Sequence, residues 1–182
     1  MNTERRLPFH TLAEALTRQP SASMEQLAQA IGVSRATLHR MVSSREELIS
    51  AIERFAYESC LQAISTVNLE EGSAVQALRR LVQELHPHAI LFLFLQRHVH
   101  SQGCLQLQGD WTRQRELLVR FFRRGQELGE FRADISAQWC VDVMSALLQA
   151  AADAVRAERL ARADVEHAVI SVLLSGISRR QE

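Results

Sequence analysis

The chain has 182 residues, 47% of them apolar and 23% charged, and its 21 basic and 21 acidic side chains give a formal net charge of zero. This composition excludes a disordered chain and a globally basic nucleic-acid coat, although a local basic patch remains open. All 21 basic residues are arginine, which excludes a lysine Schiff base and a Walker-type phosphate loop.

Apolar residues recur at helical spacing almost everywhere, and no segment alternates with the period of two that a half-buried strand shows. We therefore expect an all-α fold of about nine helices. Serines in N-cap positions and glycines after apolar runs mark most of the boundaries. The expected helices run from Phe9 to near Pro20, Ser23 to Gly32, Ser34 onward, Ser44 past Ala63, Ser73 to Leu85, Pro87 to near Gly103, Asp110 to Leu128, Ser136 through Val155, and Ala163 to near Gly176.

The cysteines and the apolar runs indicate the cell compartment. Cys60, Cys104 and Cys140 are widely spaced and form no CxxC pair, so we expect free thiols in a reducing cytosol, with a redox-sensing thiol as the alternative. The segment 1–10 lacks the apolar stretch of a signal peptide, and the longest apolar run, 89–95, is too short to cross a membrane. We expect a cytoplasmic protein with no membrane partner.

The segment Met24–Ser43, MEQLAQAIGVSRATLHRMVS, has the spacing of a helix-turn-helix. Ala28 is small where a second helix must approach closely, Gly32 permits a sharp turn, and Ser34 caps the next helix. The side chains expected in the shared core are Leu27, Ile31, Val33, Leu38 and Met41. Such a unit places its second helix in the DNA major groove, N-terminus first. A helical hairpin with no DNA role is the alternative.

The stretch Ser23–Ile52, SMEQLAQAIGVSRATLHRMVSSREELISAI, resembles the TetR family of bacterial transcriptional regulators, and GQELGEFRADIS, Gly125–Ser136, is similar to a turn of that family. The resemblance implies a homodimer with a DNA-binding domain, residues 1–46, and an effector-binding and dimerisation domain, residues 47–182. It also implies repression that ends when a small molecule binds. The chain differs from the family at His39, where an aromatic residue is usual, and at Ala22, where a threonine often contacts phosphate.

The first turn of the helix after Ser34 would present side chains to DNA. Arg35 is the expected base reader because its guanidinium matches the O6 and N7 atoms of guanine, and Thr37 can contact a thymine methyl group or a phosphate. His39, Arg40 and Arg45 are expected at the phosphate backbone, with solvated surface charge as the alternative for the arginines. The predicted DNA-binding set is Ser23, Ser34, Arg35, Ala36, Thr37, His39, Arg40 and Arg45.

The segment 89–95 and the aromatic residues after it are the expected wall of an effector site. Their composition favours a mainly apolar or aromatic ligand, with an ordinary filled core as the alternative. The predicted ligand-binding set is Cys60, His88, Phe92, Leu95, Trp111 and Phe122. Within this set, Cys60 or His88 would supply a polar contact.

Catalytic and metal sites are not expected. The histidines around the sixth predicted helix, His86, His88, His98 and His100, lack the i, i+4 spacing of a helical zinc site. The sequence also has no HExxH, GxSxG or glycine-rich phosphate loop. We therefore expect a protein that is not an enzyme and that uses no cofactor and no metal.

The last two predicted helices are apolar on more than one face, whereas a surface helix needs only one apolar stripe. We therefore expect a dimer interface in which these helices meet their counterparts from a second chain, with deep burial inside a monomer as the alternative. The predicted interface residues are Ala146, Leu147, Ala150, Val169, Val172 and Leu173.

The sequence as a whole predicts a dimeric repressor that binds an operator in double-stranded DNA and is released by a small-molecule effector. An activator or ligand-independent regulator on the same fold is one alternative. A ligand-binding or interaction protein whose helix-turn-helix no longer reads DNA is the other.

Overall fold

The computed structural model describes residues 7–98 and 105–177, and the side chains within 7–95 and 112–177. Regular secondary structure in these ranges is helical, which confirms the all-α prediction. None of the helices described is long and apolar enough to cross a membrane. The helices are α1 (Phe9–Arg18), α2 (Met24–Ala30), α3 (Arg35–Met41), α4 (Arg45–Thr66), α5 (Ala74–Leu85), η1 (His86–His88), α6 (Ala89–His98), α7 (Leu105–Glu127), α8 (Ala137–Arg156), η2 (Arg162–Asp164) and α9 (Val165–Ile177).

Serine N-caps begin many of these helices. In each case the serine hydroxyl accepts a hydrogen bond from the main-chain N–H three residues further on, which satisfies one of the free donors of the first turn. At Ser23 a second hydrogen bond completes a capping box, because the Gln26 side chain accepts from the Ser23 N–H at 2.8 Å. At Ser44 the box differs, since the Glu47 carboxylate accepts from the N–H of Ser43 at 2.6 Å. The capping residues are Ser23, Ser34, Ser44, Ser73 and Ser136.

Two predicted boundaries are wrong. Helix α7 begins at Leu105, so Asp110 lies inside the helix and does not cap it. A helix that packs along its length can continue through a weak local start signal, because tertiary contacts supply most of its stability. Pro87 lies in the short turn η1 and α6 begins at Ala89. The expected end of this helix near Gly103 lies outside the described residues.

The apolar side chains form two cores. The first core joins α1, α2, α3, the part of α4 up to Cys60 and part of α6, and its fully buried members include Leu12, Leu38, Ile52 and Phe94. The second core joins the end of α4 with α5, α7, α8 and α9, and its most buried members include Leu78, Phe122, Phe131 and Leu173.

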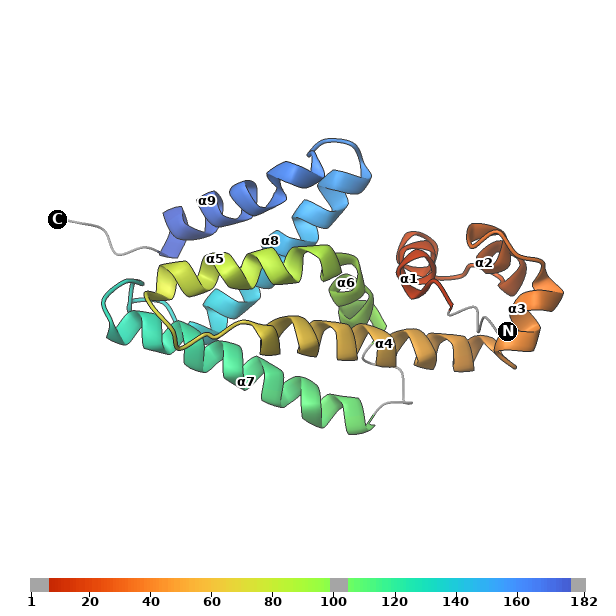
Figure 1. Ribbon diagram of the computed structural model, residues 1–182, viewed down its shortest axis with the longest axis horizontal. Coiled ribbons are helices and arrows are strands. Elements are labelled where there is room, and N and C mark those ends of the chain that lie inside the picture. The colour runs from red at the N-terminus through yellow and green to blue at the C-terminus, as the bar shows by residue number, and fades with distance from the viewer. Residues whose placement is uncertain (1–6, 99–104, 178–182) are drawn as a thin grey trace.

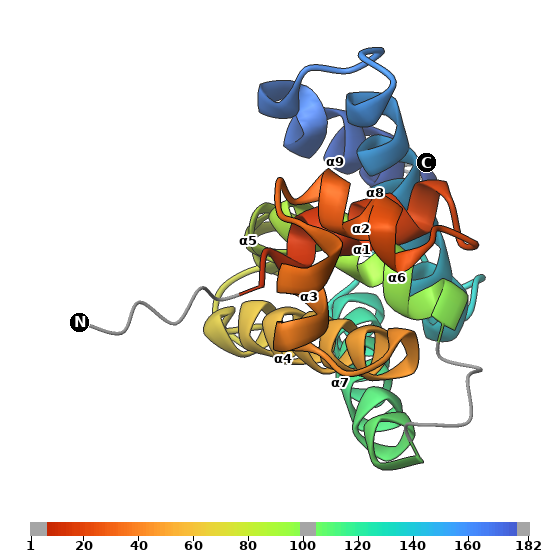
Figure 2. The same ribbon diagram turned by 90° about the vertical axis from the view of Figure 1, so that its right-hand side faces the viewer.

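Helix α4 is the element that the two cores share. Its N-terminal half contributes Leu48 and Ile52 to the first core, and its C-terminal end contributes Ala63 and Ile64 to the second. Figure 1 shows α1, α2 and α3 gathered at one end of the long axis, with α4 running from that end toward α7. Seen down the long axis, α3 lies in front of the remaining helices (Figure 2). The helix-turn-helix is therefore displayed at one end of the molecule.

Hydrogen bonds connect the turn between α7 and α8 to the start of α5 in the second core. Glu130 accepts hydrogen bonds from the main-chain N–H groups of Ala74 and Val75, both at 3.0 Å, at the start of α5. Partial burial would raise the pKa of Glu130, but these hydrogen bonds lower it below its usual value. Gly125 has no room for a side chain, because an added Cβ would lie 2.2 Å from the ring of Phe131. Long-range contacts thus fix this turn.

Candidate DNA-binding surface and ligand cavity

The turn between α2 and α3 has the geometry that the sequence predicted. Gly32 adopts a left-handed φ of 70°, a conformation that costs glycine no steric clash. Leu27, Ala28 and Leu38 are buried between the two helices, while Ile31 and Val33 are partly buried against the same core. The prediction for Met41 is not met in full: it is half-buried, and the neighbouring Val42, 5% exposed, packs into the first core.

The first turn of α3 is ordered by a small polar network. The Ser34 hydroxyl accepts from the Thr37 N–H at 3.1 Å and lies 2.9 Å from the Thr37 hydroxyl. Arg40 donates to the Thr37 hydroxyl at 3.3 Å. No described residue forms a hydrogen bond or ion pair with Arg35, whose side chain is exposed beside Ala36. Arg35 is therefore available to a partner outside the chain.

Arg45 has a different environment from the one expected. Its Nε donates to the carbonyl of Ala22 at 3.4 Å, and its guanidinium also donates to the carbonyl of Pro20. These bonds tie the start of α4 to the loop between α1 and α2. The sequence could not reveal them, because the partners lie more than 20 residues away. Ser23 and His39, also in the predicted DNA-binding set, are exposed.

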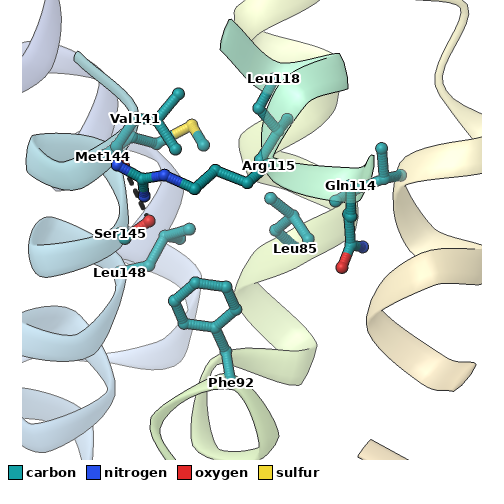
Figure 3. Close-up of a pocket in the computed structure, with 10 residues that line it drawn as sticks. Leu85, Phe92, Gln114, Arg115, Leu118, Val141, Met144, Ser145 and Leu148 are labelled. Carbon is teal, nitrogen blue, oxygen red and sulfur yellow. Dashed lines mark hydrogen bonds between the residues drawn. The ribbon is translucent and has the colours of Figure 1, made fainter. Parts of the chain in front are cut away.

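We call α1, α2, α3 and the start of α4 the first unit, and the remaining helices the second unit. A small cavity of about 50 Å³ lies between the helices of the second unit. In Figure 3, Phe92 from α6 and residues of α7 and α8 converge on it, and Arg115 extends from α7 toward α8. The Arg115 guanidinium pairs with Asp142 at 2.7 Å. The lining residues are Ile64, Leu85, Phe92, Gln114, Arg115, Leu118, Val141, Met144, Ser145 and Leu148.

A second, more open cavity of about 270 Å³ lies between α4 and α7. It shares Ile64 and Gln114 with the first, so these two side chains stand between the cavities. Sequence reasoning missed Gln114, although a signal existed. Gln114 lies in helical register with Leu118 and Phe121, at a position where an inward face is normally apolar.

Among the described side chains of the predicted ligand-binding set, only Phe92 lines the small cavity. Leu95 and Cys60 are buried in the first core, and Phe122 is packed against Phe121 and Phe131 in the second. His88 lies beside His10 of α1, with 5.9 Å between the ring centroids. The side chain of Trp111 lies outside the described residues.

The surroundings of Cys60 and Cys140 disfavour the thiolate form. Burial raises the pKa of Cys60 to about 12, and burial also raises the pKa of Cys140. A redox-sensing thiol needs a lowered pKa, so these two residues do not support that alternative, and Cys104 lies outside the described residues. Among the described side chains, no group of three potential ligands could hold a metal ion. The side chains of His98 and His100 lie outside the described residues.

The predicted dimer residues divide into two groups. Val169 and Leu173 are buried in the second core of their own chain, because they lie on the side of α9 that faces α5 and α8. Ala146, Ala150 and Val172 are exposed, and Leu147 is half-buried. Trp139, which was not in the predicted set, is 57% exposed, and Val172 is 58% exposed. Exposed apolar side chains that gather on one face mark interaction sites, whereas single ones are ordinary on a protein surface.

Comparisons with known proteins agree with this architecture. No family model matches the chain. The helix-turn-helix transcriptional regulator NfxB of Pseudomonas aeruginosa is 34% identical over 170 residues, which cover 92% of this chain and 90% of that protein. The transcriptional repressor LfrR of Mycolicibacterium smegmatis is 28% identical over 165 residues, which cover 89% of this chain and 84% of that protein.

Solved structures share the fold. The crystal structure of the TetR-like regulator LfrR in complex with proflavine superposes with a TM-score of 0.69 at 24% identity, over 94% of each chain. The ketosteroid regulator KstR2 of Mycobacterium tuberculosis gives a TM-score of 0.69 at 16% identity, over 94% of this chain and 93% of that one. The fold and the displayed α3 define a helix-turn-helix DNA-binding regulator. The chain belongs to the TetR family of transcriptional regulators.

Proposed function

We propose that the protein is a homodimeric repressor that binds a palindromic operator through α3 and leaves it when a small, mainly apolar ligand occupies the cavities of the second unit. The observation that carries this proposal is the display of α3, with Arg35 exposed at its first turn and without a partner among the described residues. LfrR, a relative, is a repressor, and its structure contains the planar aromatic compound proflavine.

We assign the recognition of DNA bases to Arg35, because its guanidinium can donate two hydrogen bonds to one guanine. Thr37 and Arg40 hold each other in place and face the same side, so they are assigned to backbone contacts. Arg45 acts indirectly, by holding the loop between α1 and α2 against α4. Ser23, Ser34, Ala36 and His39 complete the surface. The acids Glu46 and Glu47 lie just beyond it, so the basic patch is small.

The operator test uses duplexes selected from a random library by the purified protein. Half-site centres should lie about 34–36 Å apart, or at a multiple, to match a twofold dimer. Arg35→Ala should weaken operator binding by about 1–3 kcal/mol and relax sequence preference. Arg123→Ala, which removes an exposed arginine at the far end of α7, is the control. Binding that is unselective, or selectivity that survives Arg35→Ala, would contradict the assignment; unselective binding would favour a protein that no longer reads DNA.

Dimerisation is assigned to the exposed face of α8 and α9, which carries Trp139 and Val172 together with small residues. Val172→Arg should raise the dimer dissociation constant at least 100-fold, because an unpaired charge buried at an apolar contact costs several kcal/mol. Leu128→Arg replaces a similarly exposed side chain, 54% exposed, at the end of α7 and should leave the dimer intact. Sedimentation velocity measures both. A wild-type monomer at micromolar concentration would rule the dimer out.

Release from DNA requires a ligand with different affinity for the free and the DNA-bound states. The cavities are bordered by Ile64 and Tyr57 of α4, and α4 begins beside α3, so a ligand there acts on the element that both cores share. Because coupling is reciprocal, a releasing ligand must bind the operator complex less tightly than the free protein. The test screens small apolar compounds for those that raise the melting temperature of the protein. These compounds are then tested for release of the protein from its operator. Tight binders that never change operator affinity would contradict inducible repression.

A further inference from the structure

Gln114 is a buried polar residue without a partner. Gln114 is 6% exposed, and neither its amide nitrogen nor its amide oxygen has a hydrogen-bond partner among the described residues. Buried polar groups in folded proteins are nearly always paired, because an unpaired one retains its full desolvation cost. The buried amide of Gln114 therefore costs stability that an apolar side chain of the same size would not cost. A partner from outside the chain would remove that cost.

The position of Gln114 indicates where that partner binds. Gln114 and Ile64 stand between the inner cavity of about 50 Å³ and the outer cavity of about 270 Å³. In Figure 3 the Gln114 side chain lies on the α4 side of α7, whereas the neighbouring Arg115 points the opposite way. The inner cavity alone is too small for a drug-sized molecule, and the two volumes together only just reach the usual lower limit of about 300 Å³. A ligand that parts Ile64 and Gln114 would join them.

The side chains that line the two cavities indicate which class of ligand they can bind. The lining of the two cavities includes Arg113 and Arg115 but no aspartate or glutamate, so a cationic ligand would find no opposite charge. The Ser145 hydroxyl already donates to the Val141 carbonyl at 2.7 Å. The Gln114 amide presents an acceptor oxygen and a donor NH₂ group side by side, a pattern that pairs with a neighbouring donor and acceptor on the partner.

Resting on the proposed ligand-responsive function, we propose that Gln114 is the polar recognition residue of the effector site. It selects a small, neutral, mainly apolar one- or two-ring compound that carries a carboxamide or lactam group. The amide of the ligand pairs with the amide of Gln114, and the ring body fills the joined cavities. In the free protein the unpaired amide destabilises the closed arrangement of α4 against α7.

The test compares three naphthalene compounds of nearly equal shape: 2-naphthamide, 2-acetylnaphthalene, which lacks the donor, and the cationic naphthalene-2-carboxamidine. Isothermal titration should show that the wild type binds the amide at least tenfold more tightly than the other two, because each of those leaves a buried donor or acceptor unpaired. Gln114→Met should lose this preference by weakening the amide alone. Ser145→Ala, in the same cavity, should keep it.

A second measurement needs no ligand. Gln114→Met should raise the melting temperature of the free protein by about 2–6 °C, because it removes an unpaired buried amide and keeps the volume. Gln114→Leu serves the same purpose if the methionine variant folds poorly. A fall in melting temperature in both variants would mean that the amide is already paired, for instance by a buried water, and would overturn the proposal.

The binding outcomes also separate this inference from the proposed function. Equal affinity for the three compounds, no binding of the amide, or a preference that survives Gln114→Met would each overturn the role of Gln114. Operator release is measured on the same samples. An amide that binds through Gln114 but never alters operator affinity would contradict the proposed function and leave the recognition role intact.

Discussion

The two cores of this protein are built by different means. Around the first core, α2 and α3 are short helices that each begin with a serine cap and meet at a left-handed glycine, so their geometry follows from local signals. Around the second core, the turn between α7 and α8 is fixed by contacts over more than 50 residues, through Glu130 and Arg124. The second unit also contains the exposed Trp139 and the buried Gln114, whose amide has no hydrogen-bond partner among the described residues. The first unit is therefore ordered mainly by signals between near neighbours in the sequence, whereas the second is ordered by contacts between distant segments.

The largest loss of stability is expected from Gly125→Ala, which disturbs the packing of the turn between α7 and α8. The new methyl group would lie 2.2 Å from the ring of Phe131 and 3.0 Å from Cβ of Ala74, and the ring is held by Phe121 and Phe122. Because overpacking forces shifts in a dense core, we expect a loss of about 2–3 kcal/mol in the free energy of unfolding, measured with urea. Phe131→Leu in the same chain should recover part of the loss. A change below about 0.5 kcal/mol would show that the turn is not tightly packed.

Glu130→Gln tests the long-range cap of α5. The variant should lose about 1–2 kcal/mol near neutral pH, because the carboxylate accepts two main-chain N–H bonds at a helix start. The folded pKa of Glu130 is lowered, so its stabilisation is present above the unfolded pKa of about 4.3 and is lost as the pH falls through the folded pKa. The difference between wild type and variant should therefore shrink on acidification.

Urea melts of both proteins between pH 7 and pH 3 measure this difference. Glu127→Gln, which removes an exposed carboxylate one turn earlier on α7, is the control and should stay close to wild type at every pH. A gap between wild type and Glu130→Gln that is constant with pH would mean that the charge of Glu130 does not contribute.

Ser34→Ala probes a local cap of the first unit. Loss of the hydroxyl that accepts from the Thr37 N–H should lower the free energy of unfolding by about 1 kcal/mol. Ser34→Gly should cost only a few tenths, since glycine is tolerated at this position. Both are measured without DNA, by thermal unfolding. An alanine variant as stable as wild type would indicate that α3 depends on packing and not on its cap.

The smallest expected effect lies at the contact between α1 and α6. Burial lowers the pKa of His10, and burial together with the neighbouring His10 lowers the pKa of His88, while Glu84 opposes the shift. Both rings therefore take up protons less readily in the fold than in the unfolded chain, so stability decreases as the pH falls below the unfolded pKa of about 6.5. His10→Phe should flatten the melting temperature between pH 7.5 and pH 5.5. Identical pH profiles would show that this pair does not titrate with unfolding.

The sequence was informative where structure is local. The serine caps, the left-handed Gly32 and the buried Leu27 and Leu38 were all predictable, because each depends on neighbours within a few residues. The start of α7 was not, since the signal at Asp110 is overridden by packing over the rest of the helix. The carbonyl contacts of Arg45 depend on a chain reversal that no local pattern encodes.

The candidate sites show the same limit. An apolar stripe predicts that a helix face is buried, but not whether it meets its own chain or another, so Val169 and Val172 could not be distinguished by sequence. The small cavity depends on how five helices meet, and among the described side chains of the predicted lining only Phe92 lies there. Gln114 was detectable in principle as a polar residue in an apolar register.

The unbroken length of α4 has a mechanical consequence. A helix from Arg45 to Thr66 is about 33 Å long, at 1.5 Å per residue. A tilt of about 5° about one end moves the other end by about 3 Å, close to the 3.4 Å rise of one base pair in DNA. Because Arg45 ties the first end to the loop before α2, that displacement is passed to the recognition unit as a whole. A disturbance at Ile64 too slight to alter the fold would thus shift α3 by nearly one step along a groove.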